Sequence, residues 1–350
     1  MKNTLPVTRY YGSKRKIINQ IWGFIESEKL DFNSVLDIFG GTGTFSYRAK
    51  LAGKEVHYND IFGFNTIIGK AIIQNNSNRI SEKDIELILK KDENFEYKYY
   101  IKEIFKDIYY LDHENELIDI MVQNINRLKN NYSKYIAYYS LFQTCLIKRP
   151  FNTFHRKNLN LRTNDVKRKF GNKVTWEKDI MELFNKFCNE ANSYIFNNNY
   201  KNTATRSSAI NCKKSADLIY IDPPYVSEKG SHVNYHSRYH FLEALVNYEN
   251  FIKYINYEKL NHEVSLGKST EFESKYTITK DITNLIKKFN SKIIVLSYRN
   301  KGIPSIKELK NIFIENNMKC RVCLIKKHSY ALNKANKALA EYLFIAKPQN

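Results

Sequence analysis

The chain has 350 residues, of which 56 are Lys or Arg and 36 are Asp or Glu, so its formal net charge is +20. This length allows one large domain with an insertion or a smaller second domain. The excess of positive charge favours a polyanionic partner, with nucleic acid as the first candidate. Residues 1–15 lack the apolar core of a signal peptide, and no apolar run is long enough to span a membrane. We therefore expect a soluble, intracellular protein.

The five cysteines are scattered and odd in number, which fits reduced thiols better than a disulfide framework. Only Cys320 and Cys323 form a CxxC pair, and residues 318–325 around them predict a strand. A zinc site of this type needs a second pair of ligands, so we predict no metal site.

In chain order, the first motif is Tyr11-Gly12-Ser13-Lys14, which precedes apolar residues at helical spacing. Ser13 suits the N-cap of that helix. Gly12 would permit the close approach of a ligand, and Lys14 would offer it a cation. By itself, the pattern predicts no more than a capped amphipathic helix.

Residues 34–46 predict a short buried strand, a glycine-rich turn and the start of a helix, as in a nucleotide-binding βαβ unit. Gly41 and Gly43 would let the backbone approach a ligand, but Ser46 stands where a dinucleotide fingerprint has a third Gly or Ala. Asp37 would repel a pyrophosphate and attract a sulfonium or ammonium group. The turn therefore favours a ligand with positive charge.

A second strand is predicted at residues 55–60 and ends on Asp60. An acid at this point commonly accepts hydrogen bonds from ribose hydroxyls. Asp60 could instead cap the helix that follows. We prefer the ribose role because of the glycine turn beside it.

Residues 75–210 predict a succession of helices, at about 82–90, 101–110, 114–129 and 133–147, and no convincing strand. We interpret them as a mainly helical insertion.

The end of this insertion is strongly basic. Residues 148–178 contain ten Lys or Arg and two acids, interleaved with aromatic residues. A solvated basic face would have this composition too, but Arg, Asn and aromatic side chains together offer donors for phosphates and base edges. The segment is therefore the predicted nucleic-acid contact.

Residues 217–225 predict a buried parallel strand that stops at Asp222-Pro223-Pro224-Tyr225, because proline cannot donate to a sheet ladder. Ligands of α/β sheets bind at this carboxyl end. Asp222 is a fixed acceptor, and the Tyr225 ring offers a flat surface to a planar ligand. These groups could hold an aromatic amine.

The polar segment 227–232 predicts a mobile loop over this site. His232, His236 and His240 recur at every fourth position, which could present three imidazoles to a metal. No carboxylate lies in step with them, so we interpret them as residues that face DNA or belong to a lid over the site.

The α/β alternation resumes in the C-terminal part. Strands at 292–299, 319–326 and 341–346 and a helix at 306–314 predict that the sheet continues, with 333–337 as a polar loop between the last two strands.

The motifs Tyr11-Gly12-Ser13-Lys14, Asp37-Ile38-Phe39-Gly40-Gly41-Thr42-Gly43 and Asp222-Pro223-Pro224-Tyr225, in this order, resemble those of the D12 class of DNA adenine-N6 methyltransferases. In this arrangement, target recognition lies between the cofactor and catalytic motifs. The chain looks most like a methylase of a type II restriction-modification system.

The resemblance extends to residues 239–243, 296–299 and 341–345. One departure is Ile38, where the family usually has proline. Another is that no residue between 199 and 212 can be matched to the contact with the adenine of the cofactor.

The resemblance implies an α/β fold, with a Rossmann-like S-adenosylmethionine-dependent methyltransferase sheet in residues 1–74 and 211–350 and an inserted, mainly helical target-recognition region in 75–210. It implies a cofactor site made of Tyr11, Gly12, Lys14, Asp37, Phe39, Gly40, Gly41, Gly43 and Asp60. The catalytic residues would be Asp222, Pro223, Pro224 and Tyr225. The basic segment would contact nucleic acid through Arg149, His155, Arg156, Lys157, Arg162, Arg168 and Lys169.

In the mechanism that this implies, Asp222 and the Pro223 carbonyl accept the two hydrogens of the adenine amine, so that its lone pair points at the sulfonium methyl. The base must be flipped out of the duplex, and Tyr225 stacks on it. No covalent enzyme intermediate is needed.

Several alternatives stay open at this stage: methylation of cytosine N4 or of adenine in RNA, a non-catalytic DNA-binding relative, and a nicotinamide-dependent oxidoreductase. Asp rather than Ser at position 222 argues against cytosine. Intact Asp222, Tyr225 and Gly41 argue against a non-catalytic relative, and the missing third glycine argues against the oxidoreductase. The basic segment does not separate DNA from RNA.

We expect double-stranded DNA as the partner, a cognate restriction endonuclease encoded nearby without a stable complex, no membrane, and a monomer. The expected location is the bacterial cytoplasm, in association with the nucleoid. The sequence does not define the recognition site or the strand that is modified.

Overall fold

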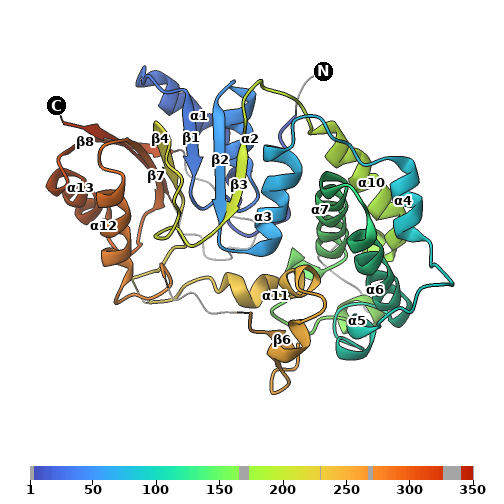
Figure 1. Cartoon of the computed structure of the whole chain (residues 1–350). Helices are drawn as coiled ribbons and strands as arrows, with labels where there is room; N and C mark the ends of the chain where they lie inside the picture. The colour runs from blue at the N-terminus through green and yellow to red at the C-terminus, as the bar shows by residue number, and fades with distance from the viewer. Residues whose placement is uncertain (1–3, 165–172, 229, 267–270, 326–339, 350) are drawn as a thin grey trace. The chain divides into compact units, whose positions relative to one another are not determined.

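The computed structural model describes residues 4–164, 173–228, 230–266, 271–325 and 340–349 (Figure 1). The chain forms two compact units. Unit 1 comprises Met1–Tyr11, Phe62–Asn197 and Tyr235–Lys268, and unit 2 comprises Gly12–Ile61, Asn198–Asn234 and Ser269–Asn350.

Within the described residues of unit 2, seven strands form one sheet in the order β3-β2-β1-β4-β7-β9-β8. Its parallel part consists of β1 (Ser34–Asp37), β2 (Glu55–Asp60), β3 (Thr203–Arg206), β4 (Leu218–Ile221) and β7 (Ile293–Arg299). β9 (Glu341–Pro348) runs antiparallel to β7 and to β8 (Met318–Ile325). This is the mostly parallel α/β sheet that the sequence predicts.

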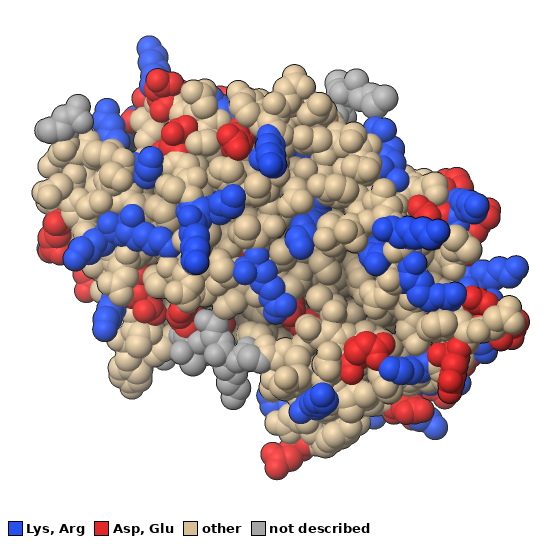
Figure 2. All heavy atoms as spheres, viewed as in Figure 1, with Lys and Arg blue, Asp and Glu red and all other residues tan. Residues whose placement is uncertain are grey.

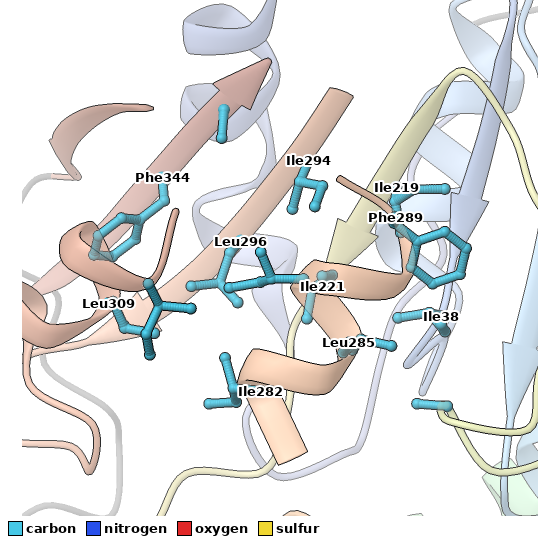
Figure 3. Close-up of a cluster of buried hydrophobic side chains, with 14 of the residues drawn as sticks. Ile38, Ile219, Ile221, Ile282, Leu285, Phe289, Ile294, Leu296, Leu309 and Phe344 are labelled. Carbon is cyan, nitrogen blue, oxygen red and sulfur yellow. The ribbon is translucent and has the colours of Figure 1, made fainter. Parts of the chain in front are cut away.

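Helices cover both faces of this sheet, which is why all four residues of β4 are buried. The helices of unit 2 are η1 (Lys14–Lys16), α1 (Ile18–Ser27), α2 (Thr44–Leu51), α12 (Ile278–Lys288) and α13 (Ile306–Glu315). On one face, Ile282 and Leu285 of α12 and Leu309 of α13 pack against Ile221 of β4 and Leu296 of β7 (Figure 3).

The opposite face of the sheet is covered by α1 and α2. Phe45 of α2 stacks on Tyr220 of β4, with ring centroids 3.7 Å apart, and Trp22 of α1 packs against Phe45. Tyr220 pairs in register with Asp37 of β1, so both side chains project toward α2.

Strand β3 corrects the expectation that residues 75–210 contain no strand. It pairs with β2 at the edge of the sheet, where Val56 donates to the side chain of Asn202. The strand has only four residues, and Ala204 is its single apolar side chain. The ladder with β2, rather than an apolar face, therefore holds it in place.

Unit 1 is mainly helical. Its α-helices are α3 (Gly63–Gly69), α4 (Glu82–Leu89), α5 (Tyr100–Ile104), α6 (Asp112–Arg127), α7 (Asn131–Ile147), α8 (Asn160–Thr163), α9 (Lys173–Glu177), α10 (Ile180–Ser193) and α11 (Tyr235–Val246). Its remaining elements are η2 (Lys70–Gln74), η3 (Pro150–Asn152), η4 (Phe251–Tyr254) and the hairpin of β5 (Ile255–Asn256) and β6 (Glu263–Val264). The predicted helix at 101–110 is shorter than expected, since α5 ends at Ile104 and the chain then turns, with a φ of 56° at Asp107.

The bounds of the two units differ from those expected for the insertion, since unit 1 also holds α3 and α11. The predicted loop at 333–337 lies outside the described residues. In the part of the chain that the structure describes, no helix combines the length and apolar character needed to cross a membrane.

Candidate active site

The parallel strands of unit 2 bring their carboxyl ends to one edge of the sheet. Charged residues end each of these strands or follow it directly: Asp37 on β1, Asp60 on β2, Arg206 on β3, Asp222 after β4 and Arg299 on β7. Ligands of α/β sheets bind at this edge, so it is the candidate active site.

The centre of this site is the ammonium group of Lys14. Its Nζ lies 3.0 Å from Asp222 Oδ1, 2.8 Å from Glu341 Oε1 and 2.6 Å from the Tyr225 hydroxyl. The Tyr225 hydroxyl also lies 2.7 Å from Asp222 Oδ1 and 2.9 Å from Glu341 Oε1. Ser297 of β7 donates to the same Glu341 oxygen at 2.7 Å.

The buried carboxylate of Glu341 and the partly buried carboxylate of Asp222 therefore share one ammonium group, which shifts the pKa of each to a different extent. Burial raises the pKa of Asp222, against the opposing charge of Lys14. For Glu341, burial is outweighed by Lys14 and by hydrogen bonds from Ser297 and Tyr225, which hold its pKa below the ordinary value. Glu341 is thus the fixed anion of the cluster, and Asp222 is the carboxylate that can still gain a partner.

Asp222 keeps one oxygen for a ligand. Both Lys14 and Tyr225 contact Oδ1, and within the described residues Oδ2 has no hydrogen-bond partner. The Asp222 side chain is 19% exposed, whereas that of Lys14 is 5% exposed. The Asp-Pro-Pro-Tyr motif therefore presents an oriented acceptor at the sheet edge, as the sequence predicts.

The carboxyl group of Asp37 is the second acceptor of the site. Its Oδ2 accepts hydrogen bonds from the backbone and hydroxyl groups of Ser46, while Oδ1 is buried and has no partner among the described residues. The hydroxyl of Tyr220, on the adjacent strand, is also buried without such a partner. Burial raises the pKa of Asp37 to about 7, and the nearby Asp222 and Asp60 add to this. A group with positive charge would satisfy this end of the site.

Neighbouring side chains fix the backbone of the glycine turn after β1. Gly41 and Gly43 have φ of 50° and 72°, and the Gly41 N–H donates to Asp60 Oδ2 at 2.8 Å. A side chain at Gly40 would meet the ring of Tyr58, whose hydroxyl donates to the Gly41 carbonyl. The sequence predicted Asp60 to contact ribose or to cap a helix. Its carboxylate supports the turn, and α3 has Phe62 as its N-cap.

Some site residues were not identified from the sequence. Glu341 and Ser297 fell within segments that resemble the family, but no role followed for them. Their signal is topological, because the start of the antiparallel β9 lies at the same edge as the ends of the parallel strands. After β3, Ser207 donates to Asn59 and lies beside the end of β2, in the region that could not be matched.

The other predicted cofactor residues lie in different places. Gly12 has φ of 81° in unit 2, and Phe39 packs edge-on against Phe272. Tyr11 belongs to unit 1, where its N–H donates to the Tyr239 hydroxyl and Arg238 lies over its ring.

Two of the arginines predicted to contact nucleic acid have internal partners in unit 1, where Arg149 is buried and Arg162 is partly buried. Arg149 is 1% exposed, and its guanidinium donates to the carbonyls of Thr153, Tyr109 and Arg156. Arg162 forms a bidentate ion pair with Glu114, at 2.7 and 2.8 Å. Both groups have internal partners, which composition does not reveal.

The other residues predicted to contact nucleic acid differ in their exposure to solvent. Arg156 and Lys157 are exposed, whereas Arg168 and Lys169 lie outside the described residues. His155 is half-buried, and burial together with the charge of Arg238 lowers its pKa to about 4, so it is neutral near pH 7. On the face shown in Figure 2, Lys and Arg are spread widely, with smaller groups of Asp and Glu, so net charge alone does not locate the DNA surface.

The histidine series does not form one surface. His240 is fully buried in unit 1, where its Nδ1 accepts from the Val264 N–H and its Nε2 lies 2.9 Å from the Tyr109 hydroxyl. This corrects the expectation that it faces DNA or belongs to a lid over the site. Within the described residues, no cluster of three His, Cys, Asp or Glu side chains could hold a metal ion.

The sheet, the glycine turn after β1 and the Asp-Pro-Pro-Tyr motif after β4 together define a methyltransferase that acts on an amino group. The family model of the D12 class N6 adenine-specific DNA methyltransferases matches residues 10–312. The chain belongs to this family, which confirms the resemblance inferred from its motifs. It is therefore a DNA methyltransferase specific for adenine N6. The alternatives of cytosine N4, RNA and a nicotinamide cofactor do not fit this family.

Curated relatives agree with this assignment. The type II methyltransferase M2.HphI of Haemophilus parahaemolyticus is 27% identical over 349 residues, which cover 97% of each chain. The modification methylase StsI of Streptococcus sanguinis is 28% identical over 331 residues, and the type II methyltransferase M.FokI of Planomicrobium okeanokoites is 26% identical over 327 residues. These matches cover 88% and 87% of this chain, respectively, but only 46% of either relative.

Proposed function

We propose that this chain transfers the methyl group of S-adenosylmethionine to the N6 amine of an adenine that is flipped out of duplex DNA. It does so at a specific sequence and protects DNA in a restriction-modification system. The observation that carries the proposal is the Asp222 carboxylate, with Oδ1 fixed by Lys14 and Tyr225 and Oδ2 left for the amine.

The residues around β1 fit a cofactor with positive charge. Asp37 Oδ1 lacks a partner among the described residues, and the glycine turn brings backbone to the site without side chains. S-adenosylmethionine would supply an electrophilic methyl group on its sulfonium. Asp37 would bind the positive charge of the cofactor, and the turn that Asp60 supports would border the ribose.

Catalysis would come from orientation of the amine. Its nitrogen is a poor nucleophile, because the lone pair is delocalised into the adenine ring. If Asp222 Oδ2 and the Pro223 carbonyl accept hydrogen bonds from its two N–H groups, the lone pair is freed and directed toward the methyl group. The new bond from the nitrogen to the methyl carbon would replace the bond from sulfur to that carbon, and the nitrogen would then release one proton to solvent. Lys14 favours the ionised form of Asp222 that this requires.

Tyr225 would fix the base through its ring. Its hydroxyl is bound to Asp222 and Glu341, and its ring meets Tyr298 edge-on at 5.4 Å. A ring held at both its hydroxyl and its edge offers a rigid surface for stacking.

Recognition of the target would come from the helical part of residues 75–210, with Arg156 and Lys157 on phosphates. Two of the expected contacts, Arg149 and Arg162, would instead support the fold that presents this segment. The enzyme would work as a monomer in the cytoplasm, near the nucleoid, with a restriction endonuclease encoded nearby.

The test is transfer of labelled methyl from S-adenosylmethionine to unmethylated duplex DNA, followed by digestion to nucleosides. N6-methyladenine is the expected product. N4-methylcytosine, or labelling of RNA alone, would contradict the proposal.

The role of Asp222 is tested separately with Asp222→Ala. Transfer should fall by about 10²-fold or more, the usual contribution of a positioned acid or base, while DNA affinity is retained. Turnover equal to wild type would exclude the mechanism even if the product is N6-methyladenine.

A further inference from the structure

We propose that Arg299 binds a phosphate group next to the flipped adenine. This inference rests on the proposed function and adds an anion site to it. Arg299 is the last residue of β7, the strand that pairs with β4 on the side opposite to β1.

The guanidinium group of Arg299 is held at the catalytic motif, and no described residue forms an ion pair with it. Its central carbon lies 5.4 Å from the centroid of the Tyr225 ring. Its Nε is buried, and among the described residues it has no hydrogen-bond partner. Glu341, which pairs with Arg299 across the strands, is bound by Lys14, Tyr225 and Ser297. A cation that is partly buried in this way is stabilised by an external anion.

The strand order indicates which part of the substrate supplies this anion. The residues that fit the cofactor, Asp37 and the glycine turn, follow β1, whereas Arg299 ends β7, with β4 between them. Adjacent strands are about 4.8 Å apart, so β7 lies about 10 Å from β1, beyond Asp222. This position on the far side of Asp222 from the cofactor residues favours an anion of the nucleotide over one of the cofactor. In DNA, that anion is a backbone phosphate.

Backbone contacts fix Arg299 relative to Tyr225. The loop that follows β7 pairs with the segment after the catalytic motif, because the Ile303 N–H donates to the Val226 carbonyl and the Glu228 N–H donates to the Lys301 carbonyl. These contacts place the backbone that carries Arg299, and its planar guanidinium can take two phosphate oxygens, which a lysine cannot do. Arg299 would thus hold the backbone while Tyr225 holds the base.

The experiment compares Arg299→Gln and Arg299→Lys with wild type on a duplex that carries the mapped methylation site. A matched control is Lys301→Gln, which removes an exposed cation two residues away. Each protein is assayed on the natural duplex and on duplexes with one neutral methylphosphonate on either side of the target adenine. The readouts are KM for DNA, its dependence on salt, and Kd for S-adenosylmethionine.

We expect Arg299→Gln to raise KM for DNA at least about tenfold, the size of one charge-assisted hydrogen bond, and to lower the salt slope by about 0.9. One of the two methylphosphonates should weaken wild type to the same extent and leave the variant unchanged. Arg299→Lys should recover the salt slope but only part of the affinity, and Lys301→Gln should match wild type on all duplexes.

If the effects of the Arg299→Gln substitution and of the methylphosphonate are additive, the proposal is overturned. A weaker Kd for S-adenosylmethionine, with DNA binding unchanged, would place the guanidinium on the cofactor carboxylate instead. If Arg299→Gln does not fold, the same comparison is made with Arg299→Lys. Failure of the proposed function is distinct, because wild type would then form no N6-methyladenine on the natural duplex.

Discussion

Lys14 and Asp222 form the central ion pair of the site, with 3.0 Å between Nζ and Oδ1, although 208 positions separate them in the sequence. The same ammonium lies 2.8 Å from Glu341, so the cluster of two carboxylates and one ammonium has a net negative charge. Lys14 thereby determines how easily Asp222 stays ionised.

Replacing Lys14 by Met should slow methyl transfer. In the profile of kcat against pH, it should also shift the acidic limb to higher pH. Burial already raises the pKa of Asp222, and removal of the opposing ammonium raises it further, so the ionised form appears only at higher pH. The measurement is kcat against pH at saturating substrates. Lys16→Met, which alters an exposed lysine of the same short helix, is the control and should retain the wild-type profile. An unshifted limb in the Lys14 variant would show that another group sets the ionisation of Asp222.

The affinity for S-adenosylmethionine should fall as the pH drops below about 7. Burial raises the pKa of Asp37 to about 7, so in the free protein this carboxyl is protonated below that pH and ionised above it. A cation binds the ionised form, and its Kd should rise toward about tenfold per pH unit on the acidic side. Titration calorimetry over about three pH units, from about pH 5.5 to about pH 8.5, would measure the Kd for S-adenosylmethionine as a function of pH.

The neutral variant Asp37→Asn serves as the control for this pH dependence. It should bind the cofactor weakly, with a Kd that changes little over the same range. Asp222→Asn should keep the wild-type dependence, because Asp37 is intact. A Kd in Asp37→Asn that is as strong and as pH-dependent as in wild type would contradict the role of Asp37.

Elements with long apolar runs and clear end signals could be predicted from the sequence. β4 has a buried run that two prolines end, and β1 leads into a glycine turn, so both were placed to within a residue or two. β3 was missed because Ala204 is its only apolar side chain and the hydrogen bonds to β2 lie far away in sequence. Local pattern does not record a partner strand.

The residues of the candidate site also differ in whether a local pattern predicts them. Asp222 and Asp37 could be placed at strand ends because each stands in a short motif that ends a strand. Glu341 reaches Lys14 only through the antiparallel register of β9 with β7, which no local pattern specifies. Conversely, Arg149 and Arg162 were predicted to contact nucleic acid because they lie in a basic segment. In the structure, Arg149 binds backbone carbonyls and Arg162 binds Glu114.

Gly40→Ala should lower both the stability of unit 2 and its affinity for the cofactor. The new Cβ would lie 2.1 Å from the Tyr58 ring, which is fully buried and bonded to the turn. Overpacking of this kind costs about 1–3 kcal/mol in the free energy of unfolding. Thermal unfolding and cofactor titration measure the two effects.

Gly23→Ala is the matched control for this substitution. Gly23 lies within α1, and a Cβ there meets nothing within 4 Å, so the change should stabilise by about 0.5–1 kcal/mol through the helix propensity of alanine. Equal unfolding temperatures for the two variants would show that Tyr58 gives way without cost.

Within the basic segment, substitution of exposed cations should affect DNA binding, whereas substitution of the buried Arg149 should affect stability. Arg156 and Lys157 are exposed, so the double change to Gln should weaken DNA binding and lower its salt slope, by about 0.9 for each phosphate that the variant no longer neutralises.

Arg149→Met should leave the slope unchanged but lower the free energy of unfolding by about 1–3 kcal/mol, because buried carbonyls lose their donor. Filter binding across a salt series and denaturant unfolding separate the two classes. A double variant with the wild-type slope would remove Arg156 and Lys157 from the DNA interface, and a stable Arg149→Met with a reduced slope would place Arg149 on DNA after all.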